Sequence, residues 1–143
     1  MTEAIFGLVG VVVGGLISGG LSLMLEGRKE RVAARVAARL VREDLLPVSL
    51  RIEDVFGGRA WPQHPDSKRR ERSWVEHRSR LATVMKYEDY AAVVQAQIAA
   101  DRFEAWFANR ADRPGLTEDD RDQLRSWNAE VGKGLSRLLQ VAE

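Results

Sequence analysis

The residues of this chain that could carry out chemistry are few and scattered. His64 lies between two prolines, and His77 follows Glu76 with no second histidine one helical turn away. A helical zinc site needs ligands at turn spacing, as in HExxH, and that pattern is missing from the sequence. The absence of cysteine removes thiol nucleophiles and cysteine–zinc sites, and there is no phosphate-binding glycine loop or GxSxG turn. We therefore expect no enzyme activity, no cofactor and no metal.

Three aspartates close together, Asp119, Asp120 and Asp122, could suggest a cation site. However, Thr117 lies three residues before Asp120, which is the spacing of a capping box at a helix start. Acidic residues are also stabilising near the positive end of the helix dipole. We therefore assign these aspartates to helix capping. The helix that follows has the clearest apolar periodicity of the chain, at Leu124, Trp127, Val131, Leu135 and Leu138.

The N-terminal segment Ala4–Leu25 contains no charged residue. As a helix of 22 residues it would be about 33 Å long, enough to cross a hydrocarbon core of about 30 Å. Two alternatives are a cleaved signal peptide and a buried helix of a soluble protein. A signal peptide begins with basic residues, and none precedes this segment. The sequence therefore predicts a transmembrane helix over residues 1–25 and a second region over residues 26–143.

Basic residues flank the predicted span on one side only. Six of them follow it within 17 residues: Arg28, Lys29, Arg31, Arg35, Arg39 and Arg42. The positive-inside rule then places the N-terminus outside and the C-terminal region in the cytoplasm, at a plasma (inner) membrane. The first three, Arg28, Lys29 and Arg31, lie close enough to the span to contact lipid headgroups.

Small residues recur at every fourth position within the predicted span. Gly10, Gly14, Ser18 and Ser22 form one ridge, and Gly15 with Gly19 forms an adjacent one. Such ridges allow two membrane helices to approach closely. They predict self-association or pairing with another membrane protein, although glycine is also common in membrane helices without this role.

The repeat RVAARVAAR over residues 31–39 predicts an amphipathic helix that continues from the span, with Gly27 as a potential hinge. Its apolar arc contains Val32, Val36 and Leu40 together with Ala33, Ala37 and Val41. The net charge is +6 over residues 26–86 and −4 over residues 87–143. The arginines beyond the membrane surface therefore form either a solvated face or a partner for the acidic C-terminal half.

Breaks after this helix are marked by proline and glycine. Pro47 is expected to end or kink it near Leu46, and a loop is expected at about 57–67. The basic run Lys68–Arg72 near Trp74 could bind single-stranded nucleic acid by charge and stacking. Because Trp74 is in helical register with Leu81, we expect it in the core instead and expect no nucleic-acid binding.

A helix over about residues 87–109 carries apolar residues on two faces. Its first half places Tyr90, Val93, Val94 and Ile98 on one face, while Phe103, Trp106 and Phe107 point the opposite way. Either the helix breaks near Asp101, or the three aromatic residues meet another element of the core or a partner surface. A second break is expected at about 110–117.

The order of these features resembles that of uncharacterised small single-pass membrane proteins of high-GC bacteria or their phages. The resemblance covers most of the chain. Its residues are the glycine-rich Ala4–Leu25, the arginine-rich Arg28–Arg42, the W-x-x-x-R-x-x-L motif at Trp74, Arg78 and Leu81, and then Glu88, Asp89 and Tyr90. It implies a membrane anchor and a cytoplasmic helical domain without a known activity.

We therefore expect an all-α protein, with one transmembrane helix that continues into a bundle of about four helices. Its expected role is that of a membrane-anchored interaction or scaffold protein that self-associates. The alternative is a phage-type membrane effector that acts in lysis or superinfection exclusion.

Overall fold

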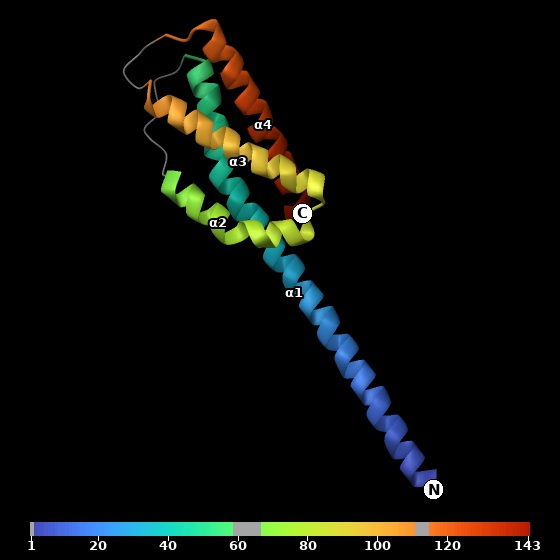
Figure 1. The fold of residues 1–143 in the computed structure, drawn as a ribbon. Helices are drawn as coiled ribbons and strands as arrows, with labels where there is room; N and C mark the ends of the chain where they lie inside the picture. The colour runs from blue at the N-terminus through green and yellow to red at the C-terminus, as the bar shows by residue number, and fades with distance from the viewer. Residues whose placement is uncertain (1, 59–66, 111–114) are drawn as a thin grey trace. The chain divides into compact units, whose positions relative to one another are not determined.

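The computed structural model describes the backbone of residues 2–58, 67–110 and 115–143, and the side chains of residues 24–58, 68–110 and 115–143. Over these residues the chain forms four α-helices and no strand, which confirms the expected all-α class. The helices are α1 (Thr2–Phe56), α2 (Ser67–Val84), α3 (Tyr87–Ala108) and α4 (Glu118–Ala142) (Figure 1). The chain divides into two compact units, residues 1–33 and residues 34–143.

The first unit consists of the N-terminal part of α1. Within the part of the chain that the structure describes, no helix is both long enough and apolar enough to cross a membrane. The predicted span Ala4–Leu25 lies outside the described side chains, apart from the exposed Met24 and Leu25. The predicted ridges of Gly10, Gly14, Ser18 and Ser22 and of Gly15 and Gly19 also lie outside them. The span and its ridges therefore stay predictions.

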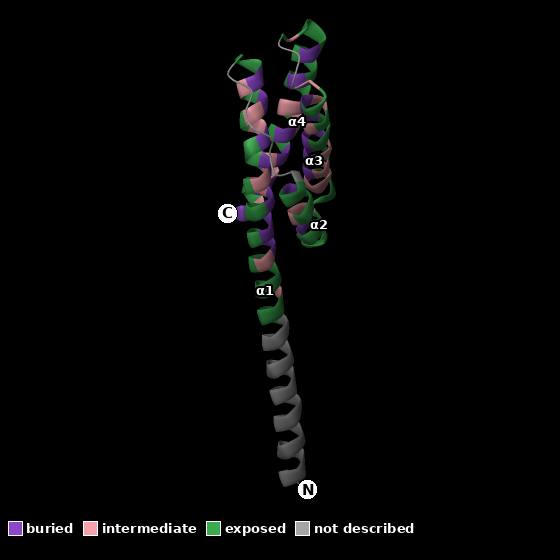
Figure 2. Ribbon diagram, turned by 90° about the vertical axis from the view of Figure 1, so that its left-hand side faces the viewer, coloured by how far each residue is buried: buried purple, intermediate pink, exposed green. Residues whose placement is uncertain are grey.

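The second unit packs the remainder of α1 with α2, α3 and α4 around one core. From residue 34 onward, buried positions on α1 alternate at spacings of four and three residues, which keeps them on one side of the helix. They are Ala34, Ala38, Val41, Leu45, Val48, Ile52 and Val55, each at most 5% exposed. Figure 2 shows this buried face running along α1.

The apolar arc expected on α1 is split between the core and the solvent. Ala37 and Val41 are buried as expected, but Val32, Val36 and Leu40 are 60%, 49% and 38% exposed. The α1 core face begins with alanines, and small side chains let neighbouring helices approach closely. In this first part of the face, the larger side chains of Val32, Val36 and Leu40 lie on the opposite side of the helix.

Pro47 lies inside α1. The expectation that the helix ends near Leu46 is wrong, because α1 continues for nine residues beyond the proline to Phe56. An interior proline costs about 3 kcal/mol through a lost hydrogen bond and a clash with the preceding turn. Burial of Val48, Ile52 and Val55 beyond it contributes about 1.5–3 kcal/mol per side chain, which offsets that cost.

The part of the chain beyond α1 contributes both large apolar side chains and alanines to the core. Leu81 of α2 and Met85, which follows the end of α2, are buried, and Trp74 packs against the core with its ring 6.1 Å from that of Tyr90 on α3. The core interpretation of Trp74 is therefore confirmed. At the α3–α4 contact, Gly134 lies against Ala96 so tightly that a Cβ there would be 2.4 Å from the Ala96 Cβ.

Candidate functional site

The face of α1 that lies opposite the core is exposed and largely apolar. We call it the outer face and define it by Val36, Arg39, Leu40, Glu43, Leu46 and Leu50. At about 100° per residue these six positions fall within an arc of about 120°. Their four apolar members are 49%, 38%, 39% and 53% exposed, in chain order. All six side chains are exposed, although Arg39 reaches the end of α4 and Glu43 lies at the edge of a cavity beside α2, so the face is accessible to a partner.

Two opposite charges lie in the middle of the outer face. Arg39 and Glu43 are four residues apart and exposed. One guanidinium nitrogen of Arg39 lies 3.4 Å from the backbone oxygen of Ala142, near the end of α4. The outer face thus combines apolar area at both ends with a pair of charges at its centre. In paired helices the apolar residues of the seam provide affinity, and a polar residue within the seam selects the register at a cost in stability.

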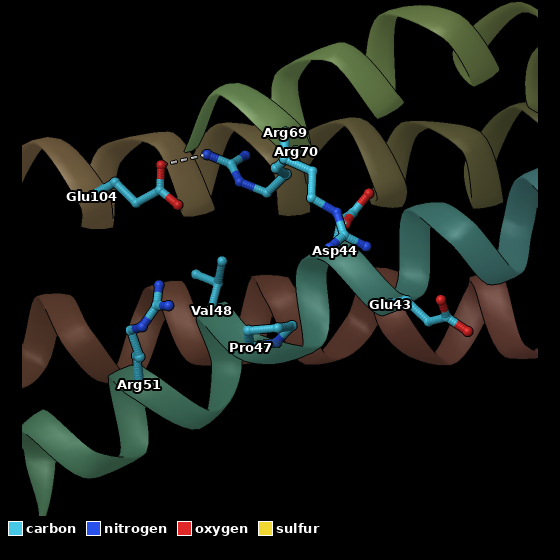
Figure 3. Close-up of a pocket in the computed structure, with 8 residues that line it drawn as sticks. All are labelled: Glu43, Asp44, Pro47, Val48, Arg51, Arg69, Arg70 and Glu104. Atoms are coloured by element: carbon cyan, nitrogen blue, oxygen red, sulfur yellow. Dashed lines mark hydrogen bonds and ion pairs between the residues drawn. The ribbon is translucent and has the colours of Figure 1, made fainter. Parts of the chain in front are cut away.

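A cavity of about 180 Å³ lies where α1, α2 and α3 meet (Figure 3). Its lining is mostly charged and contains Glu43, Asp44, Pro47, Val48, Arg51, Arg69, Arg70 and Glu104. Arg69 on its rim lies 3.3 Å from Asp44. Arg70 also lines the cavity and is itself buried.

Arg70 is 5% exposed and reaches three acceptors on α3. It donates to Gln97 Oε1 at 3.0 Å, to Asp101 Oδ1 at 2.7 Å and to Glu104 Oε2 at 2.7 Å. Burial alone would lower the pKa of Arg70, but the hydrogen bonds to Glu104 and Asp101 outweigh it and raise that pKa. Arg70 therefore stays charged and fastens α2 to α3.

Arg51 lies on the other side of the cavity. Its Nη1 and the Oε1 of Glu104 are both buried and have no partner within the protein. Burial lowers the pKa of Arg51, and the charge of Glu104 opposes this shift. A polar cavity of this volume holds several water molecules, which can satisfy both atoms. Its three arginines face three acids and the adjacent Asp101, so the local charge does not favour an anion.

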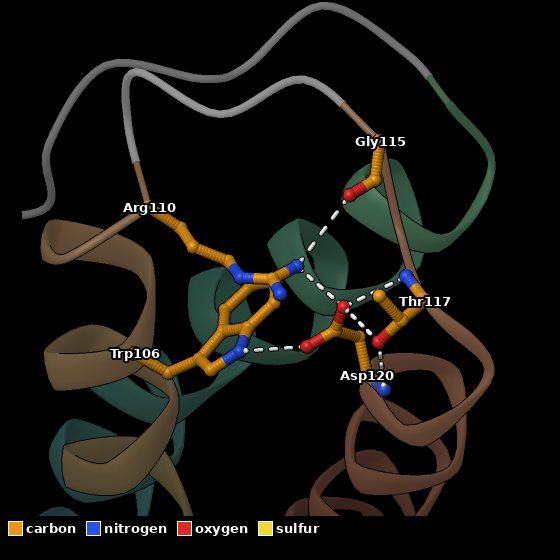
Figure 4. A network of polar contacts seen from close by, with 5 residues as sticks. All are labelled: Trp106, Arg110, Gly115, Thr117 and Asp120. Carbon is orange, nitrogen blue, oxygen red and sulfur yellow. Dashed lines mark hydrogen bonds and ion pairs between the residues drawn. The ribbon is translucent and has the colours of Figure 1, made fainter.

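A second polar network closes the corner between α3 and α4 (Figure 4). The carboxylate of Asp120 accepts a hydrogen bond from the backbone N–H of Thr117 at 2.8 Å and from Trp106 Nε1 at 3.3 Å. It also pairs with Arg110, whose guanidinium carbon lies 5.4 Å from the centre of the Trp106 ring. Thr117 and Asp120 form the predicted capping box. Asp120 therefore has a structural role, as the spacing of Thr117 and Asp120 predicted.

The predicted partner surface of Phe103, Trp106 and Phe107 belongs to the core. Phe103 and Phe107 are 1% and 4% exposed, and the half-buried Trp106 packs edge-on against Trp127 of α4. The alternative break near Asp101 is also wrong, since α3 runs unbroken from Tyr87 to Ala108. The aromatic face meets α4, while Tyr90, Gln97 and Asp101 on the other side of α3 contact α2.

The predicted lipid-contacting residues Arg28, Lys29 and Arg31 are all exposed. They belong to the first unit, and headgroup contact stays a prediction for them. Within the described residues, no three histidine or acidic side chains come together in a way that could hold a metal ion.

The residues that sequence reasoning missed are Leu46 and Leu50 of the outer face and the buried Arg70. Leu46 and Leu50 flank Pro47, where we expected the helix to stop, so they were not placed on the same face as Val36. For Arg70 a weak signal exists, because α3 places Gln97, Asp101 and Glu104 at turn spacing on one side.

Comparison with known proteins gives no relative. No protein-family model, no curated protein and no solved structure matches this chain.

Proposed function

We propose that the chain is a membrane-anchored helical interaction protein. In this proposal Ala4–Leu25 spans the membrane with the N-terminus outside, and residues 26–143 meet other proteins in the cytoplasm. We further propose that it self-associates and acts as a scaffold rather than as an enzyme. The observation that carries the proposal is the outer face of α1, which presents exposed leucine and valine side chains opposite a fully buried face.

The polar clusters of the second unit support an interaction role over a catalytic one. Arg70 is held by three acceptors of α3, and Asp120 by Thr117, Trp106 and Arg110. A general acid or base needs a free proton site beside a substrate cavity. Both clusters instead direct their hydrogen bonds at neighbouring helices, which is typical of structural roles.

The uncharged N-terminal segment supports the anchor, and its flanking charges support the orientation. Exposure of Arg28, Lys29 and Arg31 leaves them available for anionic headgroups, each worth about 1 kcal/mol near the surface. Proteins on the membrane surface need no large interface to associate, because anchoring raises their effective concentration.

Membrane fractionation of the full chain tests the anchor. We expect the protein in the membrane pellet after an alkaline wash, and a reporter fused after Glu143 should be active in the cytoplasm. Full-length protein in the soluble fraction would contradict the proposal, and an active reporter outside would contradict the orientation. Purification from detergent-solubilised membranes, with measurement of the complex mass, then reports the partners.

The predicted ridge within the span has its own test. Gly14→Leu should weaken the signal of a membrane two-hybrid assay, because a leucine keeps two helices apart. Gly20→Leu is the matched control, since Gly20 belongs to neither ridge and lies about 120° from Gly14 around the helix. Equal signals for both variants would show that association does not depend on the ridge.

A further inference from the structure

The outer face of α1 has the spacing of a helix-pairing seam. Val36, Arg39, Glu43, Leu46 and Leu50 follow one another at intervals of three, four, three and four residues. This is the interval at which a helix presents side chains to a second helix along its whole length. The buried seam of α1 has the same rhythm on the opposite side, from Ala34 to Val55. One seam packs against the core of the unit, and the other is exposed.

The two central charges restrict what can cover this face. A purely apolar partner would remove Arg39 and Glu43 from water without offering their charged groups any hydrogen-bond partner, which is strongly unfavourable. A fitting partner therefore offers an acid and a base one helical turn apart, between apolar residues. A second copy of this chain offers that arrangement through its own Arg39 and Glu43. The hydrogen bond from Arg39 to Ala142 leaves other guanidinium N–H groups available.

We propose that a second copy of this chain packs on the outer face, with the two α1 helices parallel. The parallel direction rests on the proposed function, since two copies anchored by their N-terminal segments enter the cytoplasm the same way. In such a pair Arg39 lies one turn, about 6 Å along the axis, from the partner's Glu43. An arginine side chain spans that distance, and the two-fold symmetry forms the contact twice.

The absence of cysteine makes cross-linking a direct test. Leu50→Cys is introduced into the otherwise cysteine-free full chain, which is oxidised in native membranes and run on a non-reducing gel. A parallel pair brings residue 50 next to its own copy, within the Cα separation that a disulfide requires. Tyr87→Cys is the matched control, because Tyr87 is 85% exposed but lies on α3. We expect at least a five-fold higher dimer fraction for Leu50→Cys.

Two outcomes would overturn the inference. One is a Leu50→Cys dimer fraction no higher than that of Tyr87→Cys. The other is cross-linking between Val36→Cys and Leu46→Cys chains when these are mixed, with little for Leu50→Cys alone. That result would indicate antiparallel helices, in which residues 36 and 46 meet across a centre at residue 41. Fractionation of the same samples separates this failure from that of the proposed function, since an anchored chain still sediments with membranes.

A charge exchange provides a second readout. In the Leu50→Cys background, Arg39→Glu and Glu43→Arg should each lower the dimer fraction about three-fold or more, by placing like charges together. The double exchange restores opposite charges between copies and should recover most of the dimer. If the double variant stays as low as the single ones, a second copy does not pair through these charges and the proposal is wrong.

Discussion

Arg70 of α2 and Glu104 of α3 are joined by a contact of 2.7 Å between Nη2 and Oε2 in the interior of the second unit. Their side chains are 6% and 12% exposed. Eight of the 18 residues of α2 are charged, and the helix buries only a few apolar side chains. The ionic contact therefore helps to set the position of α2 along α3, because Arg70 and Glu104 meet in only one register of the two helices.

Arg70→Met should lower the free energy of unfolding by about 3–5 kcal/mol. Removal of Arg70 takes from the largely buried Glu104 the cation that contacts it, with Arg51 acting on it only across the cavity, and leaves Gln97 Oε1 without its donor. Urea unfolding of the detergent-solubilised chain, followed by circular dichroism, measures the change. Arg78→Met is the control, because Arg78 is exposed on the same helix and should change the value by less than about 0.5 kcal/mol. Equal losses for the two variants would contradict the role of Arg70.

Replacement of two glycines of α4 by alanine should change the stability of the protein in opposite directions. A Cβ at Gly134 would lie 2.4 Å from the Ala96 Cβ and 3.2 Å from the Ala92 carbonyl oxygen, so α3 and α4 must separate. We expect Gly134→Ala to destabilise the protein by about 1–3 kcal/mol. A Cβ at Gly132 meets nothing within 4 Å, so Gly132→Ala should stabilise it by about 0.5–1 kcal/mol through helix propensity. Melting temperatures of the two variants should lie on opposite sides of the unmodified value.

Substitution of Phe103 tests whether the aromatic residues of α3 belong to the core or form a partner surface. Phe103→Ala should cost about 3–5 kcal/mol of stability, since the ring is 1% exposed and contacts Trp106, Phe107 and Trp127. Tyr87→Ala on the same helix should have little effect, because Tyr87 is 85% exposed. A stable Phe103→Ala protein that loses only its binding partners would favour a partner surface instead.

Strong local signals made α4 predictable from the sequence. The Thr117–Asp120 capping box marked its start, and the apolar spacing from Leu124 to Leu138 marked its buried face. Local chemistry decides both features, because capping involves four consecutive residues and periodicity involves one helix. The all-α class followed from the same kind of evidence.

Features that depend on tertiary packing were not predictable in the same way. Pro47 has a local preference against the helix interior, but buried residues on both sides of it hold α1 together. Which side of the Ala- and Val-rich stretch is buried was also undetermined, because residues 32–41 carry apolar side chains nearly all round. The core selects the side with alanines, and this choice creates the outer face with Val36, the residue nearest the start of the proposed seam.

Asp120 should give the stability of the protein a measurable pH dependence. Burial of its carboxyl by itself would raise the pKa of Asp120, but hydrogen bonds from Thr117, Arg110 and Trp106 outweigh burial and lower that pKa. An unfolded chain has an aspartate pKa of about 3.9. The ionised Asp120 therefore stabilises the fold fully above about pH 4, and this contribution is lost as pH falls through the lower folded-state pKa.

Asp120→Asn isolates that contribution. The variant should be less stable by about 1–3 kcal/mol at pH 7, because charge-assisted hydrogen bonds in the corner between α3 and α4 are weakened. Below about pH 4 the unmodified protein loses the same contribution, so the difference between the two unfolding curves should shrink. Asp119 is an exposed neighbour in the same helical turn. The stability of Asp119→Asn should therefore follow that of the unmodified protein closely across this pH range. A constant difference from pH 3 to pH 7 for Asp120→Asn would mean that its charge does not contribute, and that the hydrogen bonds act through geometry alone.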